Sequence, residues 1–279
     1  EGKRQQYKLG QYFRRRYNKL LGDKYSPNKV YIQSADRDRL LMSAQANLAG
    51  LFPPHAEEKW NEDIAWQPIP VHTMPLNLDY ALRGVKFPID CPRYSAALEK
   101  YRNESPEVQN MFKENNERIL YWISDWARKA IEPNGVLEAM ALFKFKMYSN
   151  TKEMARLWSG FLIKEMFERF AQKLNSTLVP NRSVWFYSTQ DITIGTLLNS
   201  FELFETHALP FASSLHLELY KNGENEHYIQ IFFRKSNEEI LLPLNIPNCG
   251  EKCTLDQLYN LYNDIIPDRD HDTECRLTN

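Results

Sequence analysis

Two short polar segments carry the residues of this chain that could bind a ligand or move a proton. Each follows a predicted strand and precedes a predicted helix: Ser34 to Arg39 at one junction, and Ser188 to Asp191 at another. In an open α/β sheet, ligands bind beyond the carboxyl ends of the strands, beside helix N-termini. Arg39 could hold a carboxylate, and Asp191 could pair with a protonated amine or act as a general acid. The two junctions therefore carry the functional prediction.

The pattern of hydrophobic residues predicts an α/β sheet with a helical insertion. Short β-branched and aromatic runs predict strands, and apolar residues at helical intervals predict helices. Residues 91–175 have a helical pattern throughout, and Asp36 is the predicted cap of the helix that follows it. We expect strands at 30–33 and 184–187, a hairpin of 215–220 with 228–233 around 221–223, and helices at 2–21, 40–48, 192–198 and 254–262.

Several segments resemble the histidine acid phosphatases, in their prostatic and lysosomal branch. The second signature of that family is a strand followed by His-Asp, and here the strand that begins at Trp185 leads to Gln190-Asp191. Further family blocks match at 30–54, 66–73, 209–213, 247–253 and 273–275. The resemblance implies one unit with a phosphoglycerate-mutase-like (histidine phosphatase) sheet flanked by helices. Its α/β core would be 1–90 and 180–279, with a shortened helical cap at 91–179.

The resemblance also implies that catalytic chemistry has been lost. In the family, the Asp is the general acid, the preceding His lies against the phosphoryl group, and an Arg-His-Gly-x-Arg-x-Pro motif supplies the nucleophile. This sequence keeps the acid as Asp191 and the phosphate-gripping arginine as Arg39, but it has Gln190 at the His position and no Arg-His-Gly motif. An acid without a nucleophile cannot turn over a phosphomonoester. We therefore expect a pseudoenzyme, without metal or cofactor.

The alternative is a weak acid phosphatase. In the family, the segment before Glu1 forms a central strand and carries the nucleophilic His, so an intact nucleophile could lie upstream of Glu1. Gln190 would still impair such an enzyme, because an amide replaces a side chain that is cationic near pH 5 to 6. A third hypothesis is a surface-recognition protein, such as a venom or salivary antigen with an empty cleft.

The functional precedent is a group of inactive acid phosphatase-like proteins in the saliva of blood-feeding insects. They sequester host mediators such as biogenic amines and leukotrienes. By that resemblance, Asp191 would bind the ammonium group of serotonin or another amine, Trp66 and Trp126 would stack on its ring, and Arg39 would hold an acidic ligand beside Gln190. We expect a small-molecule partner, and the relatives add the expectation of a homodimer.

Each of these residues also has a simpler role. Asp191 begins a predicted helix, so it could be only an N-cap. Arg39 could be a solvated arginine paired with Asp36 or with the neighbouring Asp38. Trp66 and Trp126 fit a hydrophobic core better than a ligand site when taken alone. The junction context and the long family match raise Arg39 and Asp191 to predicted site residues.

Cysteines and glycosylation sequons predict a secreted protein. Cys249 and Cys253 are close enough to close a small loop, and the family pattern implies a second disulfide, Cys91–Cys275. Asn-x-Ser/Thr sequons occur at Asn103, Asn175 and Asn181. No signal peptide is visible, but Glu1 looks like an internal start, so the absence of a signal peptide says little about export.

Charge and composition exclude several classes of partner. The 279 residues are 43% hydrophobic, enough for a large core, and a net charge of −1 gives no field suited to nucleic acid or an anionic membrane. No apolar run is long enough to span a bilayer. The segment Asp268 to Glu274 lacks a metal-ligand spacing and predicts an exposed tail, His72 predicts a structural role, and Arg14 to Arg16 predict a solvated helix face.

Overall fold

A parallel three-stranded sheet forms the centre of the molecule. β1 (Val30–Ala35) lies between β2 (His72–Met74) and β3 (Val184–Ser188). Five of the six residues of β1 are buried, as expected for a parallel strand covered on both faces by helices. The architecture comes from a computed structural model, which describes residues 1–85, 91–119, 136–236 and 240–277.

A second sheet is the predicted hairpin. It consists of β4 (Ser214–Lys221) and β5 (His227–Arg234), which pair antiparallel along their whole length. The turn is wider than predicted, because the amide of Asn222 donates to the carbonyl of Glu226 at 2.9 Å. Asn225 supplies the left-handed backbone that the turn needs, at φ 70°.

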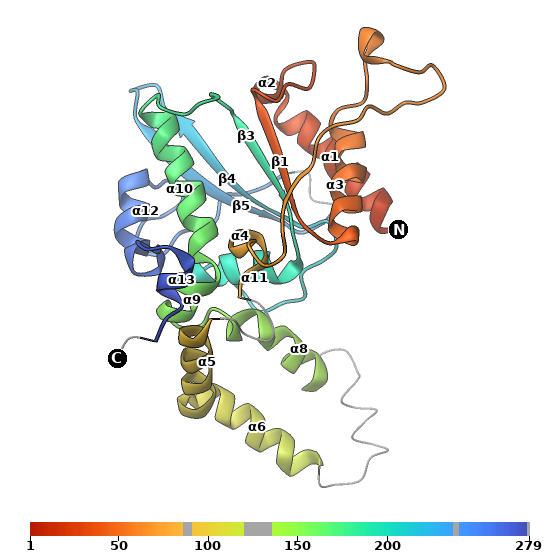
Figure 1. Cartoon of the computed structure of the whole chain (residues 1–279). Helices are drawn as coiled ribbons and strands as arrows, with labels where there is room; N and C mark the ends of the chain where they lie inside the picture. Colours follow the sequence, from red (N-terminus) through yellow and green to blue (C-terminus); the bar gives the residue numbers. More distant parts are fainter. Residues whose placement is uncertain (86–90, 120–135, 237–239, 278–279) are drawn as a thin grey trace.

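Helices cover both sides of the sheets (Figure 1). On one side, α1 (Gly2–Arg16) crosses α3 (Asp38–Leu51) so closely that a Cβ on Gly10 or Gly50 would collide with the backbone of the other helix. On the other side lies α10 (Gly160–Leu174), with further helices beside it. The other helices of the described residues are α2 (Asn18–Leu21), η1 (Ala56–Glu58), α4 (Tyr80–Arg83), α5 (Pro92–Glu104), α6 (Pro106–Ile119), α8 (Val136–Met147), α9 (Lys152–Trp158), α11 (Asp191–Ser200), α12 (Leu255–Tyr262), η2 (Asn263–Ile265) and α13 (His271–Glu274).

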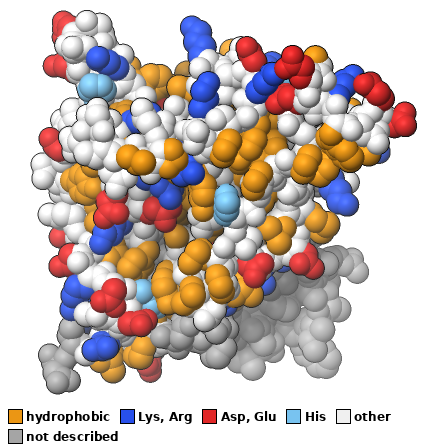
Figure 2. All heavy atoms as spheres, turned by 45° about the horizontal axis from the view of Figure 1, so that its top comes forward, with side chains coloured by type: hydrophobic (Ala, Val, Ile, Leu, Met, Phe, Trp, Pro, Cys, Tyr) orange, Lys and Arg blue, Asp and Glu red, His pale blue; other side chains and the backbone are white. Residues whose placement is uncertain are grey.

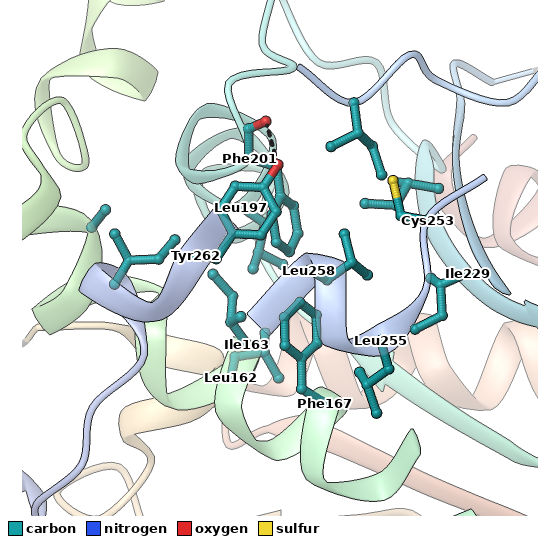
Figure 3. Packing of buried hydrophobic residues seen from close by; sticks show 14 of the residues in the cluster. Leu162, Ile163, Phe167, Leu197, Phe201, Ile229, Cys253, Leu255, Leu258 and Tyr262 are labelled. Atoms are coloured by element: carbon teal, nitrogen blue, oxygen red, sulfur yellow. Dashed lines mark hydrogen bonds between the residues drawn. The ribbon is translucent and has the colours of Figure 1, made fainter. Parts of the chain in front are cut away.

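The largest hydrophobic cluster joins α10, α11, α12 and β5 (Figure 3). Phe167 and Leu258 are fully buried in it, and the Tyr262 hydroxyl donates to the carbonyl of Phe201 at 3.1 Å. Such a cluster, drawn from distant parts of the sequence, fixes the sheets and helices as one α/β unit. The predicted α/β class is confirmed.

The helical insertion divides into two parts. α5, α6 and α8 project away from the sheets and α10 packs against them, whereas α9 lies between the two parts, in contact with α5 and α10 (Figure 1). The described part of 91–175 is helical apart from short turns, as predicted. The division into a core of 1–90 and 180–279 with a cap of 91–179 stays a prediction. α10 belongs to the predicted cap by its residue numbers but shares a hydrophobic cluster with the core. Both predicted disulfides, Cys91–Cys275 and Cys249–Cys253, are present.

Three local predictions are wrong. The N-cap of α3 is Arg37, not Asp36, because the chain stays extended for longer after β1. The segment predicted as an exposed tail ends in Glu274, whose side chain is fully buried among arginines. The face Arg14 to Arg16, predicted to be solvated, is exposed only at Arg15, because Arg14 is half-buried and Arg16 is bound by Glu218 of β4. For Glu274 and Arg16, a distant segment of the chain supplies the partner that decides the local structure.

Candidate functional site

The two strand-to-helix junctions lie side by side at the carboxyl ends of two neighbouring parallel strands. β1 and β3 pair in register from Val30 opposite Val184 to Ser34 opposite Ser188, so both strands end at the same edge. The Ser188 hydroxyl donates to the carbonyl of Leu40, 2.9 Å away, and ties the junctions together. The sheet therefore gathers the polar residues that follow the two strands.

Arg39 and Gln190 are in direct contact. Arg39 Nη2 donates to Gln190 Oε1 at 2.8 Å, across 151 residues of sequence. Gln190 is the N-cap of α11 but makes no capping hydrogen bond with its side chain, so its amide is available for Arg39. Arg39 itself is exposed, and the structure shows no ion pair between it and Asp36 or Asp38 among the described residues. Its guanidinium retains further N–H groups that can reach an anionic ligand.

Asp191 is the first residue of α11 and combines a local role with an exposed carboxylate. Its Oδ1 accepts from the amide of Ile192 at 2.8 Å, which satisfies one N–H group of the first turn. Its Oδ2 lies 3.9 Å from Lys144 Nζ of α8, and the Asp191 side chain is 52% exposed. An exposed pair at this distance contributes little stability and can be exchanged for a ligand group. We call Arg39, Gln190, Asp191 and Lys144 the junction site.

The structure does not bring Trp66 to the junction site. The carbonyl of Trp66 accepts from Trp60 Nε1 at 2.9 Å, and the two rings meet edge to face. The neighbouring Gln67 donates to the carbonyl of Phe52, which follows α3 at the opposite edge of the sheet (Figure 1). The second predicted aromatic residue, Trp126, lies outside the described residues. His72 stacks on Tyr31 with ring centroids 4.7 Å apart, in keeping with a structural role.

Sequence reasoning missed a large cavity between the two sheets. It has a volume of about 640 Å³ and lies between β3 and β4, with α1, α3 and α10 around it. We call it the inter-sheet gap. Ser43, Ser188 and Thr189 line its end at the junction site. Predicting it would have required knowing that β3 and β4 face each other in space. The sequence of a single strand does not specify its neighbours.

A buried polar cluster connects α1 to β4 beside this gap. Arg16 binds Glu218 through two nitrogens, at 2.8 and 3.0 Å, and the Tyr17 hydroxyl donates to the same carboxylate. The Tyr17 oxygen also lies 2.5 Å from His216 Nδ1. Burial lowers the pKa of His216 to about 4. Burial alone would raise the pKa of Glu218, but hydrogen bonds from Arg16, Tyr17 and Tyr220 hold it below the usual value.

A second charged cluster surrounds Glu274 near the C-terminus. Its carboxylate is bound by Arg156, lies 3.1 Å from Arg93 Nη1 and lies 3.5 Å from Arg269 Nη2. Burial opposes ionisation, but the hydrogen bond from Arg156 outweighs it, and the pKa of Glu274 falls to about 2. The cluster lies next to the Cys91–Cys275 disulfide in sequence and fixes this end of the chain. Its arginines are committed to Glu274 and to neighbouring carboxylates.

The described residues contain no group of three His, Cys, Asp or Glu side chains that could hold a metal ion. No helix among them combines the length and the apolar character that crossing a bilayer requires. On the face shown in Figure 2, acidic and basic side chains are interspersed among hydrophobic ones. The junction site itself is a small polar site whose charged groups are Arg39, Lys144 and Asp191.

Comparison with known proteins gives a consistent family match. The family model described as "Histidine phosphatase superfamily (branch 2)" matches residues 1–120 and 108–234. Human lysosomal acid phosphatase is 31% identical over 99% of this chain and 71% of its own length, and human prostatic acid phosphatase is 30% identical over 100% and 78%. Among solved structures, the phytase from Citrobacter braakii superposes with a TM-score of 0.61 at 15% identity, over 99% of this chain and 88% of the phytase.

Proposed function

Because this chain belongs to branch 2 of the histidine phosphatase superfamily, we propose that it is a catalytically inactive member that binds a small mediator at the junction site. The observation that carries the proposal is the Arg39–Gln190 hydrogen bond. A glutamine amide neither titrates nor carries a positive charge near neutral pH, so it can position Arg39 but cannot help to neutralise a transferring phosphoryl group.

The charges of the site support an acidic ligand first. Arg39 and Lys144 are both exposed cations, and Asp191 neutralises only one of them. A carboxylate, as in a leukotriene, would accept charge-assisted hydrogen bonds from Arg39. A biogenic amine such as serotonin is the second ligand class. Its ammonium group would pair with Asp191 and would have to displace Lys144, a weak competitor at 3.9 Å.

Secretion is part of the proposal. The two disulfides are typical of an oxidising compartment, and all the cysteines are used in them. Three sequon asparagines are exposed in the structure: Asn103, Asn175 and Asn181. The sequence relatives are lysosomal and prostatic acid phosphatases. A mass loss on enzymatic removal of N-glycans, from protein expressed through a secretory pathway, would support this location.

The first experiment is isothermal titration of the protein with a cysteinyl leukotriene and with serotonin. Saturable binding with a Kd below about 1 µM, or roughly −8 kcal/mol, is the expected result for at least one of them. For a variant of Arg39, Arg4→Gln is the matched control, because Arg4 is an exposed arginine on α1. Flat traces for both ligands would contradict the binding proposal.

Catalytic inactivity has its own test. We expect no turnover of p-nitrophenyl phosphate at pH 5, either for the protein or for its Gln190→His variant, because restoring an imidazole does not supply a nucleophile. Turnover by the unaltered protein would contradict inactivity. Turnover by Gln190→His alone would mean that Gln190 is the residue that disables an otherwise complete phosphatase, and the alternative of a weakened enzyme would replace this proposal.

A further inference from the structure

One stripe of α11 meets the C-terminal end of α8. Asp191, Gly195 and Asn199 follow one another at intervals of four residues, so they lie on the same face of α11. Each of them faces α8 or the turn that follows it. The Asn199 amide donates to the carbonyl of Ser149 at 3.1 Å and to its hydroxyl at 3.0 Å. The stripe therefore fixes α8, one of the projecting helices, against a helix of the largest hydrophobic cluster.

Gly195 leaves the space that Phe145 of α8 fills. A Cβ at Gly195 would lie 2.6 Å from Phe145 Cδ1 and 3.2 Å from Phe145 Cβ, which is too close for ordinary contact. Phe145 is only 3% exposed, and its ring meets the ring of Phe204 edge to face. A glycine inside a helix is less favourable than an alanine unless packing requires it. At Gly195, the close approach of Phe145 supplies that requirement.

The Phe145 ring also determines where Lys144 lies. Lys144 Nζ is 4.8 Å from the centre of this ring, within the range of a cation–π contact, and 3.9 Å from Asp191 Oδ2. An exposed ion pair alone does little to fix a long and flexible lysine side chain. Because the ring is itself fixed in the space at Gly195, the place of the ammonium group depends on the contact between α8 and α11.

This contact controls the charge of the junction site. With α8 packed at Gly195, Lys144 offsets the charge of Asp191, and Arg39 is left to attract an anion. Without the contact, Asp191 is open to an amine. We propose that Gly195 and Phe145 are positioning residues, which give the junction site its preference for an acidic ligand over an amine. The proposal rests on the proposed function, because it concerns which ligand the same site prefers.

The test is isothermal titration of a Gly195→Ala variant with a cysteinyl leukotriene and with serotonin. The added methyl group forces the Phe145 ring, and α8 with it, away from α11, so Lys144 leaves Asp191. We expect the affinity for serotonin to rise and the affinity for the leukotriene to fall, each about two- to fivefold. Gly223→Ala is the matched control, because a Cβ there meets nothing within 4 Å, and it should change neither affinity. A purely structural role would weaken the binding of both ligands.

A second background tests whether the effect passes through Lys144. In a Lys144→Gln protein, Gly195→Ala should change neither affinity further, because the ammonium group is already absent. Phe145→Leu tests the contact from α8 without altering α11, and it should shift the two affinities in the same directions as Gly195→Ala. A fall in both affinities in Gly195→Ala and Phe145→Leu, or an equal effect of Gly195→Ala with and without Lys144, would overturn the proposal.

Amide hydrogen exchange follows the contact without any ligand. We expect exchange over residues 144–149 to be about tenfold faster in Gly195→Ala than in the unaltered protein, and unchanged in Gly223→Ala. Equal rates in Gly195→Ala would mean that α8 has not moved, and the positioning role would be wrong. Flat titration traces with the unaltered protein would instead contradict the proposed function, and the ligand preference with it. Binding by the unaltered protein with unchanged affinities in Gly195→Ala would overturn the positioning role alone.

Discussion

Asp191 and Glu274 are both carboxylates beside basic side chains, but only Asp191 is open to a ligand. The Asp191 side chain is 52% exposed and has Lys144 at 3.9 Å, whereas the Glu274 side chain is 0% exposed and has three arginines around it. In water, the first pair contributes little, because solvent screens it. In the interior, the second carboxylate cannot be removed without leaving its arginines uncompensated. Burial therefore decides which acid serves the fold and which can serve a ligand.

The largest effect is expected from breaking the buried cluster. Glu274→Gln removes the charge that Arg93, Arg156 and Arg269 share, and we expect a loss of about 3–5 kcal/mol in the free energy of unfolding. Urea denaturation measures it. Asp272→Asn, at an exposed acid two residues earlier, is the control and should change the stability by less than about 0.5 kcal/mol. Equal effects of the two variants would remove the distinction between buried and exposed acids.

The dependence of stability on pH should test the buried cluster around His216 and Glu218. Burial holds the pKa of His216 at about 4, below its ordinary value of 6.5, so the unfolded chain binds a proton at this residue that the folded protein excludes. Neutral His216 therefore makes its full contribution to the free energy of unfolding above pH 6.5. As the pH falls towards 4, this contribution is lost, and the free energy of unfolding decreases by up to about 3 kcal/mol.

The measurement is the free energy of unfolding between pH 7 and pH 4. A His216→Gln variant is less stable at pH 7, because contacts with Tyr17 and Ser214 are altered, but its stability should change less over this pH range. Glu274 does not confuse the result, because its pKa is lowered from 4.5 to about 2 and its stabilisation is lost mainly below pH 4.5. Parallel pH profiles of the two proteins would mean that His216 is not the titrating group.

A moderate effect is expected from the exposed cation of the junction site. Arg39→Gln removes a charged donor, and the affinity for a cysteinyl leukotriene should fall about tenfold, which corresponds to roughly 1.4 kcal/mol. Isothermal titration measures the change, with Arg4→Gln as the control. Thermal unfolding should be almost unaffected, since Arg39 is exposed. An unchanged affinity would exclude Arg39 from the ligand site.

The smallest effect should come from Lys144. Lys144→Gln frees Asp191 from its neighbouring cation, so the affinity for serotonin should rise about two- to fivefold while stability changes by less than about 0.5 kcal/mol. Asp191→Asn should weaken serotonin binding, and Asp23→Asn, at an exposed acid far along the chain, is its control. A fall in serotonin affinity in Lys144→Gln would mean that Lys144 contributes to the site instead of competing for it.

The elements of the fold were predictable because each depends mainly on local residue types. The alternation in 215–220 and 228–233 specifies a hairpin, and Thr254 specifies the start of α12 by its capping box. The short spacing of Cys249 and Cys253 predicted one disulfide, and the family resemblance added the other, Cys91–Cys275. Asp36 was wrong as a cap because the helix start depends on how far β1 continues, which is decided by pairing with β2 and β3.

The sequence by itself determined the α/β class, the family resemblance and the identity of the junction residues, because these follow from periodicity and motifs along the chain. Only the tertiary structure decided which of them meet. It placed Arg39 on Gln190 and Lys144 beside Asp191, left Trp66 at the far edge of the sheet, and buried Glu274 among arginines. Contacts between residues a hundred or more positions apart depend on strand order and helix packing, which no local pattern specifies.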